Sequence, residues 1–351
     1  MRRTYSIQFT TLQRTVLSWL LLVTATFSAA GCELIETAGE PDGVENHLSV
    51  PSGFPSVPWP AHNPITRAKV DLGQRLFTDA GLSSDGTVSC QSCHLPEAGF
   101  AEHVPVSIGV DGRSGIRNSP SLVNVAYQNL FFWDGGALSL ENQVFGPLES
   151  EDEMNANLGD VLDYLTADSS YVQAFERAFR RPPDLAGLTQ ALASFQRTIR
   201  SGGSRYDTYL SGQTGALSES ERRGLNLFEG KANCTTCHSG FLISDRSFRN
   251  NGLAVISSDS GRARITTLAE DYGRFKVPSL RNVDITAPYM HDGRFQSLME
   301  VVDHYDAGGS ETRQQDAAIQ PLHLTAQEKA DLAAFLRSLS DTSIRVGLSG
   351  N

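Results

Sequence analysis

The residues best suited to chemistry stand in two copies of one short motif, in which two thiols and an imidazole fall within five positions. The two copies consist of Cys90, Cys93 and His94 and of Cys234, Cys237 and His238. The chain has five cysteines in all, so only one lies outside these motifs. Such a set of ligands can hold a zinc ion, exchange a disulfide or attach a haem.

The spacing of the motifs separates these three kinds of site. A zinc ribbon places its two CxxC pairs about 15 to 20 residues apart, whereas these pairs lie more than a hundred residues apart, each with its own histidine. A redox dithiol needs no histidine after the second cysteine. CxxCH is the attachment signal of c-type haem, in which both thiols form thioethers and the histidine becomes the proximal iron ligand. We therefore expect two covalently bound haems.

The N-terminus reads as an export signal over residues 1–31. Three arginines precede the apolar run 16–30, which is too short to span a membrane. The run ends in Ala-Ala-Gly-Cys, which is similar to a lipobox and predicts a periplasmic lipoprotein tethered to the membrane through acylated Cys32. The alternative is ordinary cleavage near the same small residues, which would leave a soluble periplasmic protein. Export agrees with the haem motifs, because this attachment takes place outside the bacterial cytoplasm.

The charge of the chain disfavours nucleic acid as a partner. The formal net charge is −11 over 351 residues, and removal of the signal would take away three arginines and no acidic residue. Haem propionates add further negative charge. A partner with a positive surface is therefore favoured.

The rest of the chain suggests a linker followed by two modules of similar build. Residues 32–60 are rich in Pro, Gly and Ser and have no sustained period. LGQRLF then precedes the first haem motif, and GLNLF precedes the second. We expect haem domains over 61–204 and 205–351, with the boundary in the Gly- and Ser-rich stretch 200–215.

These modules are predicted to be mainly α-helical. Capping boxes at 218–221 and 325–328 each open a helix, and the runs 160–179 and 185–199 carry apolar residues at helical spacing. Strand-like alternation is scarce. Helices must therefore position both haem motifs.

Two long stretches resemble the bacterial dihaem cytochrome c peroxidase and MauG superfamily. They contain RNSPS, FFWDG, GP followed by EM, and TAPYMHDG in that order, and the resemblance runs from about residue 61 to about residue 340. It implies two cytochrome c-like haem domains packed together, with the haems and a calcium site near their interface. Asn118 and the carbonyls of Thr286 and Pro288 match the calcium ligands.

For the first haem, the resemblance implies an open iron site. Peroxidases of this family carry a histidine in the segment where Ser107 to Val110 stand here, and valine cannot ligate iron. His103 is the alternative ligand of the first haem iron, but we expect it to be a surface residue. The resemblance assigns acid/base catalysis to Glu153 and places Gln143 and Pro147 in the distal pocket.

For the second haem, the resemblance implies Tyr305 as the sixth ligand, where peroxidases have a methionine. The rivals nearby in the sequence are His304, Met290 and Met299. An oxygen donor lowers the haem reduction potential relative to methionine sulfur. Trp133 matches the tryptophan that couples the two haems electronically.

Together these features predict an enzyme that reduces hydrogen peroxide at the first haem and stores or passes oxidising equivalents through the second. The Tyr305 assignment favours oxidation of a partner protein. In MauG a relay tryptophan stands just before the second haem motif, but Lys231-Ala232-Asn233 stands here, so the particular substrate of MauG is not implied. The alternatives are a conventional peroxidase with a small cytochrome or cupredoxin as electron donor, and a non-catalytic electron carrier.

Overall fold

The computed structural model describes residues 48, 50–253, 258–310 and 314–348. The expected export signal, and Cys32 with its predicted acylation, lie outside these residues. Within them, no helix is both long enough and apolar enough to cross a membrane.

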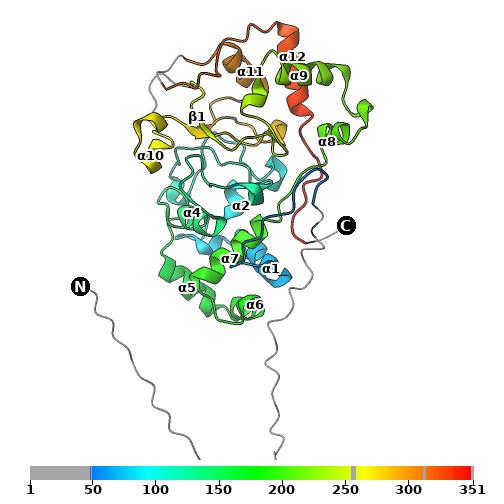
Figure 1. Ribbon diagram of the computed structural model, residues 1–351. Coiled ribbons are helices and arrows are strands. Elements are labelled where there is room, and N and C mark those ends of the chain that lie inside the picture. The colour runs from blue at the N-terminus through cyan, green and yellow to red at the C-terminus, as the bar shows by residue number, and fades with distance from the viewer. Residues whose placement is uncertain (1–47, 49, 254–257, 311–313, 349–351) are drawn as a thin grey trace, which may run out of the picture. The chain divides into compact units, whose positions relative to one another are not determined.

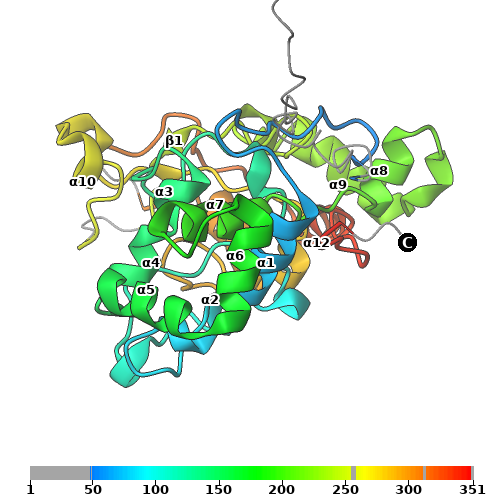
Figure 2. The same cartoon turned by 90° about the horizontal axis from the view of Figure 1, so that it is seen from below.

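The helices that precede residue 200 share one large hydrophobic core and lie in the lower part of the view in Figure 1. They are α1 (Arg67–Phe77), α2 (Cys90–Cys93), α3 (Leu140–Gln143), α4 (Phe145–Glu149), α5 (Leu158–Ala167), α6 (Ser169–Phe179) and α7 (Leu185–Gln196). Helix α1 packs against α6 and along α7, as the view from below shows (Figure 2). The predicted run 160–179 forms two helices, because Asp168 ends α5 and caps the start of α6.

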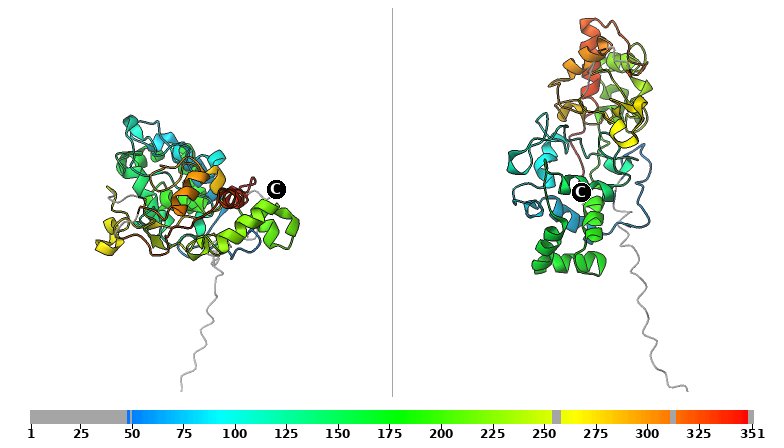
Figure 3. Two further views of the ribbon diagram at one scale, coloured as in Figure 1. Left: turned by 90° about the horizontal axis from the view of Figure 1, so that it is seen from above. Right: turned by 90° about the vertical axis from the view of Figure 1, so that its left-hand side faces the viewer.

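Helices α8 (Arg205–Leu210), α9 (Glu219–Glu229), α11 (Leu298–Asp306) and α12 (Ala326–Arg337) contribute to a second, smaller core. The short helix α10 (Ala263–Thr266) has no residue in it. Strands β1 (Phe248–Arg249) and β2 (Phe275–Lys276) pair antiparallel in the only sheet of the described residues. The two helical groups occupy opposite ends in both views that show the long direction (Figures 1 and 3).

One helix pair recurs in the two halves and explains the repeated sequence pattern. Helix α1 crosses α7 at Gly73, where an added Cβ would lie 2.0 Å from the Ala191 carbonyl oxygen. Helix α9 crosses α12 at Gly224, where the same atom would lie 2.0 Å from the Asp331 carbonyl oxygen. In each half the glycine permits close approach of two backbones, and the phenylalanine four residues later is buried in the core.

The predicted capping boxes are confirmed. The Ser218 hydroxyl accepts from the Glu221 amide while the Glu221 carboxylate accepts from the Ser218 amide, and Thr325 with Glu328 does the same for α12. These reciprocal bonds satisfy amides that an unfinished helix end would leave unpaired. Helices are the main regular structure, as predicted, although long irregular segments connect them and carry much of both sites.

Two stretches without predicted helices also pack closely. Residues 52–60 form no helix or strand, yet Phe54 contacts Tyr127 and Phe241 edge-on, at 5.7 and 5.0 Å between ring centroids. The stretch 200–215 contains α8, which is held by a bidentate ion pair between Asp207 and Arg281. Both stretches therefore have structural partners, and the domain limits remain a prediction.

Candidate haem sites

The first haem motif forms a wall of a cavity within the larger core. Cys90, Cys93 and His94 all line it. The His94 Nδ1 atom lies 2.9 Å from the carbonyl oxygen of Phe100, which the chain reaches after turning back at Gly99 with a positive φ. A carbonyl partner on Nδ1 fixes the tautomer in which Nε2 is free to ligate a metal.

The thiols of both motifs are held in their neutral form. Burial raises the pKa of Cys90 and of Cys234 to about 12, with a further contribution from the neighbouring cysteine, and burial raises that of Cys93 to about 11. A redox CxxC pair instead depends on a thiol with a lowered pKa. These environments therefore disfavour the dithiol alternative.

The predicted distal residues line the same cavity as the first haem motif. Gln143 ends α3, Pro147 lies in α4, and Glu153 follows in the turn after α4. The start of α3 is fixed by a buried pair in which the Arg197 guanidinium donates to both carboxylate oxygens of Glu141, at 2.7 and 2.9 Å. The structure thus brings together three residues that the sequence spreads over eleven positions.

Glu153 differs from the other acids of its segment in its surroundings. Among the four acidic residues of 149–153, it alone contributes to the cavity wall. Burial raises the pKa of the Glu153 carboxyl, and the negative charge of Asp152 raises it further. The Glu153 side chain is nevertheless exposed to solvent, as are the other three acids of this segment. A carboxyl with a raised pKa that lines a cavity is suited to exchange protons there.

The segment 107–110, where the sequence resemblance led us to look for a histidine, packs against the backbone next to Glu153. The Val110 amide donates to the Glu153 carbonyl oxygen at 2.8 Å, and the Val110 side chain is fully buried. At Gly109 an added Cβ would lie 2.2 Å from the Asp152 carbonyl oxygen, so this approach requires glycine. His103 is exposed and does not line the cavity.

The second haem motif lines a larger cavity, of about 210 Å³, in the smaller core. Cys234, Cys237 and His238 form one side of it, and the His238 Nδ1 atom lies 3.2 Å from the Ile243 carbonyl oxygen. Burial lowers the pKa of His238, as it does for His94, so both imidazoles stay in the neutral form that ligates iron.

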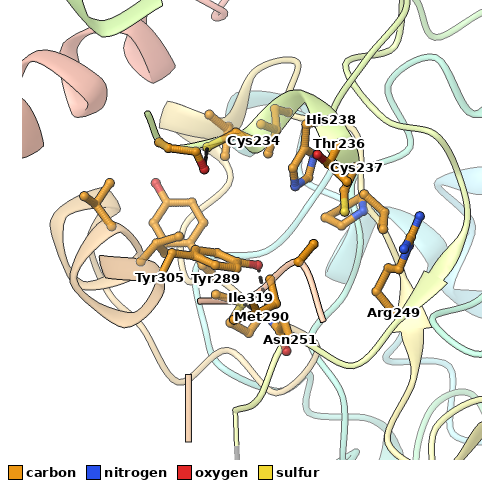
Figure 4. A pocket seen from close by; sticks show the side chains of 18 of the residues that line it. Cys234, Thr236, Cys237, His238, Arg249, Asn251, Tyr289, Met290, Tyr305 and Ile319 are labelled. Carbon is orange, nitrogen blue, oxygen red and sulfur yellow. Dashed lines mark hydrogen bonds between the residues drawn. The ribbon is translucent and has the colours of Figure 1, made fainter. Parts of the chain in front are cut away.

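Tyr305 and Met290 contribute to the other side of this cavity, together with Asn251 (Figure 4). The Asn251 side-chain amide donates to the Tyr305 hydroxyl at 3.2 Å and lies 3.5 Å from the Met290 sulfur. Burial raises the pKa of Tyr305 to about 12. The other two rivals are absent from the lining: His304 contacts the Asn251 carbonyl through Nε2 at 2.9 Å, and Met299 is 39% exposed.

Trp133 connects the two halves. It lines the second cavity, and its indole Nε1 donates to the Asn118 carbonyl oxygen at 2.8 Å. Its own carbonyl accepts from the Lys276 amide of β2, also at 2.8 Å. The tryptophan is thus held by hydrogen bonds to both halves of the chain.

The predicted calcium ligands are only partly placed together. The Asn118 amide donates to the His291 carbonyl oxygen at 2.7 Å, which brings it to the segment that also contains Thr286 and Pro288. The Asn118 side-chain amide donates to the Val104 carbonyl oxygen, leaving its own oxygen as a possible ligand. Among the described residues no group of three or more acidic, histidine or cysteine side chains is placed to bind a metal. Calcium therefore stays a prediction.

The residues of both motifs fit c-type haem. Each cavity offers paired thiols and a histidine whose Nδ1 faces a carbonyl, and apolar side chains make up most of the remaining lining. These are the groups that thioether attachment and axial ligation require.

Comparison with known sequences agrees with this interpretation. The family signature described as di-haem cytochrome c peroxidase matches residues 67–215, and that described as cytochrome c matches residues 222–340. A cytochrome-c peroxidase, IdrP1, of Pseudomonas sp. strain SCT is 38% identical over 82% of this chain and 84% of its own. The chain belongs to the dihaem cytochrome c peroxidase and MauG family.

Other relatives come from the MauG side of this family. The methylamine utilization protein MauG of Methylorubrum extorquens is 39% identical over 81% of each chain. A solved structure of a MauG-like protein associated with microbial copper homeostasis is 36% identical and superposes with a TM-score of 0.80 over 84% of this chain and 95% of its own. Membership implies two c-type haems, hydrogen peroxide and a redox partner. The fold therefore contains two cytochrome c-like domains.

Several residues of the second site were not found by sequence reasoning. Asn251 follows β1 and reaches Tyr305 across 54 positions of the chain, and Arg249 and Lys276 face the cavity from the paired strands. No local motif marks them, because a two-residue strand is too short to show alternation. The one hint in the sequence was that Lys276 directly precedes the VPSLRN stretch, which belongs to the region of family resemblance.

Proposed function

We propose that this protein is an exported dihaem oxidoreductase that reduces hydrogen peroxide at the first haem and oxidises a partner protein through the second. The observation that carries the proposal is the first cavity, where Glu153, Gln143 and Pro147 share a lining with Cys90 to His94. Among the described residues, His94 is the one histidine of that lining. In this proposal the iron keeps a position open to peroxide.

In this proposal the chain's own residues manage the protons and the access of water. The first haem, when bound, supplies an iron that accepts peroxide and promotes cleavage of its O–O bond. The Glu153 carboxylate takes one proton from hydrogen peroxide and returns it to the oxygen that leaves as water. Gln143 offers a polar neighbour to the bound oxygen atoms, while Pro147 forms a wall that limits the entry of bulk water.

The contacts of Trp133 and Tyr305 support transfer of oxidising equivalents to the second site. Trp133 lines the second cavity, and its indole donates a hydrogen bond to the Asn118 carbonyl oxygen. Asn118 belongs to the half of the chain that contains the first haem motif. Tyr305 faces the cavity opposite His238, and a phenolic oxygen ligand would hold the potential of that haem low. A low potential favours storage of an oxidising equivalent over acceptance of electrons from a small cytochrome.

A conventional cytochrome c peroxidase is the second candidate function. It is favoured by Met290, whose sulfur also lines the second cavity near Asn251, and by the peroxidases among the relatives. A methionine ligand would raise the potential of the second haem and suit it to a small cytochrome or cupredoxin donor.

Steady-state turnover of the holoenzyme with hydrogen peroxide and a reduced small cytochrome or cupredoxin separates these functions. The partner-oxidising proposal expects slow oxidation of both donors. Fast turnover of either donor would overturn it in favour of the conventional peroxidase. A protein that consumes no peroxide in any redox state would be an electron carrier.

The location and the calcium site belong to the same proposal. Export to the periplasm is supported by the haem motifs, and a lipid on Cys32 would keep the protein at the membrane. Calcium at Asn118 would join the two halves beside Trp133, where its charge would affect both haems. Mass spectrometry of the mature N-terminus and metal analysis after chelation test these two points separately.

A further inference from the structure

Lys276 places a partly buried positive charge in the wall of the second cavity. It ends β2 and lines the same cavity as Cys234 and His238. Its ammonium Nζ donates to the Leu130 carbonyl oxygen at 3.0 Å. Burial lowers the pKa of Lys276 to about 8, although the charge of Asp134 opposes this shift. The side chain therefore still carries its charge at neutral pH.

No carboxylate of the described residues forms an ion pair with this ammonium. Asp134 is already bound by two other cations, Arg117 at 2.7 Å and Arg264 at 3.1 Å. An ammonium has three N–H donors, of which the Leu130 carbonyl takes one. A partly buried cation in an apolar cavity is costly without a counter-ion, so its position points to an anion that is not part of the protein chain.

The paired strand provides an instructive contrast. Arg249 on β1 lines the same cavity, but its guanidinium is paired with Asp316 at 2.9 Å and with Asp245 at 3.2 Å. Arg249 is thus paired with two carboxylates, whereas Lys276 has no ion pair with a carboxylate in the part of the chain that the structure describes. Of the two cations that the strands place in the cavity wall, Lys276 is therefore the one that can pair with an anionic group in the cavity.

The haem that belongs in this cavity brings two carboxylates. They are carried on propionates at the edge of the macrocycle opposite the vinyl groups, which Cys234 and Cys237 would bind. We propose that the Lys276 ammonium binds a propionate carboxylate of the second haem. The contact is an ion pair, in which no covalent bond changes, and it fixes the carboxylate edge of the haem next to Trp133, whose carbonyl accepts from the Lys276 amide.

This ion pair has a consequence for the reduction potential of the second haem. The oxidised haem carries one more positive charge than the reduced haem, so a nearby cation favours reduction. In the holoenzyme, Lys276→Gln should shift the reduction equilibrium of the second haem about tenfold or more toward the oxidised form, which is a fall of about 59 mV per tenfold for one electron. Lys276→Arg keeps the positive charge and should therefore leave the potential of the second haem close to the wild-type value.

A spectroelectrochemical titration that resolves both haems measures this effect. Lys231→Gln is the matched control, because it removes a lysine of the same half whose ammonium pairs with Glu328 at the surface. The potential of the first haem serves as an internal reference. A Lys276→Gln protein with two bound haems and an unchanged second potential would overturn the proposal, and so would an equal shift in the control.

A crystal structure of the wild-type holoenzyme gives a second test that does not depend on the variants. A Lys276 Nζ within about 3.2 Å of a propionate oxygen would support the proposal. An Nζ bonded only to the protein would refute it. Neither measurement uses peroxide, so the outcome is independent of the function proposed above and depends only on the second haem.

Discussion

The two cavities are built alike on the histidine side and differently on the side that faces it. Each motif follows a helix that crosses its partner at a glycine, and each histidine presents Nδ1 to a carbonyl a few residues later. The cavity of His94 is also lined by a carboxyl, an amide and a proline from the stretch 143–153. The side facing His238 includes a phenol, an amide and a thioether.

This difference shows which part of a repeated module decides its chemistry. The repeated helix pair supplies haem attachment, and the irregular segments supply the group that faces the iron. Glu153 is suited to exchange a proton, because burial and the charge of Asp152 raise its pKa above the usual value of a carboxyl. The Tyr305 hydroxyl accepts from Asn251 and has a pKa raised to about 12, so it is not suited to exchange protons at neutral pH.

Removal of the carboxyl in the first cavity is expected to have the largest effect on this contrast. Glu153→Gln should keep both haems and slow the reaction of the ferric protein with peroxide by about 100-fold or more, the scale of a positioned acid/base. Stopped-flow spectroscopy measures the rate. Glu151→Gln is the control, because Glu151 belongs to the same turn but does not line the cavity.

The pH dependence provides a further signature of Glu153. The carboxylate acts as the base, so the wild-type rate should fall as pH drops through its raised pKa, by about tenfold per pH unit below it. This acidic limb should be missing in Glu153→Gln. An unchanged rate at neutral pH, or a limb that survives the substitution, would remove Glu153 from the mechanism.

Exchange of the candidate ligand in the second cavity should change the reduction potential of the second haem. Tyr305→Met should raise the reduction potential of the second haem by on the order of 100 mV, within the roughly 0.8 V that axial ligands span. A redox titration measures the change, with Met299→Leu as a control at an exposed position. If Met290→Leu shifts the potential and Tyr305→Met does not, methionine is the ligand and the conventional peroxidase is favoured.

Disturbance of the helix pair that recurs in both halves should lower the stability of the protein and leave the reaction with peroxide at the first haem intact. Gly224→Ala would place a methyl group 2.0 Å from the Asp331 carbonyl oxygen and force α9 away from α12. We expect a loss of about 1–3 kcal/mol in the free energy of unfolding, measured by chemical denaturation. Gly215→Ala is the control, since nothing lies within 4 Å of the added atom there. Equal stability of the two variants would contradict the proposed role of the crossing.

The smallest effect concerns the hydrogen bond to Tyr305. Asn251→Leu removes a donor from the phenolic oxygen, which should become a stronger ligand. The potential of the second haem should fall by a few tens of millivolts, because one hydrogen bond contributes about 1 kcal/mol. Gln320→Leu, at an exposed residue of the same cavity, should leave it unchanged. A rise in potential would show that Tyr305 does not ligate the iron.

The sequence predicted the parts of this structure that depend on local chemistry. The haem motifs and the capping boxes at Ser218 and Thr325 are recognisable because their reasons lie within a few residues. The glycine of each repeated helix is visible in the sequence only as part of a repeat, because the backbone that it approaches is more than a hundred residues away. Family resemblance selected Glu153 from an acidic run, and the turn after α4 shows a physical basis for that choice.

The remaining residues depend on contacts that the sequence does not display. Asn251 meets Tyr305 only because β1 and α11 fold around one cavity. Lys276 becomes notable only when its lack of a carboxylate partner among the described residues is seen in three dimensions. Both features belong to the second cavity, where irregular segments contribute much of the wall.

The most direct test of the contrast between the cavities is low-temperature EPR of the ferric holoenzyme before and after one equivalent of hydrogen peroxide. We expect one high-spin and one low-spin haem at the start, both of which change rapidly without prior reduction. Two low-spin haems that do not respond to peroxide until the protein is half-reduced would contradict the account, because another ligand would then close the first site.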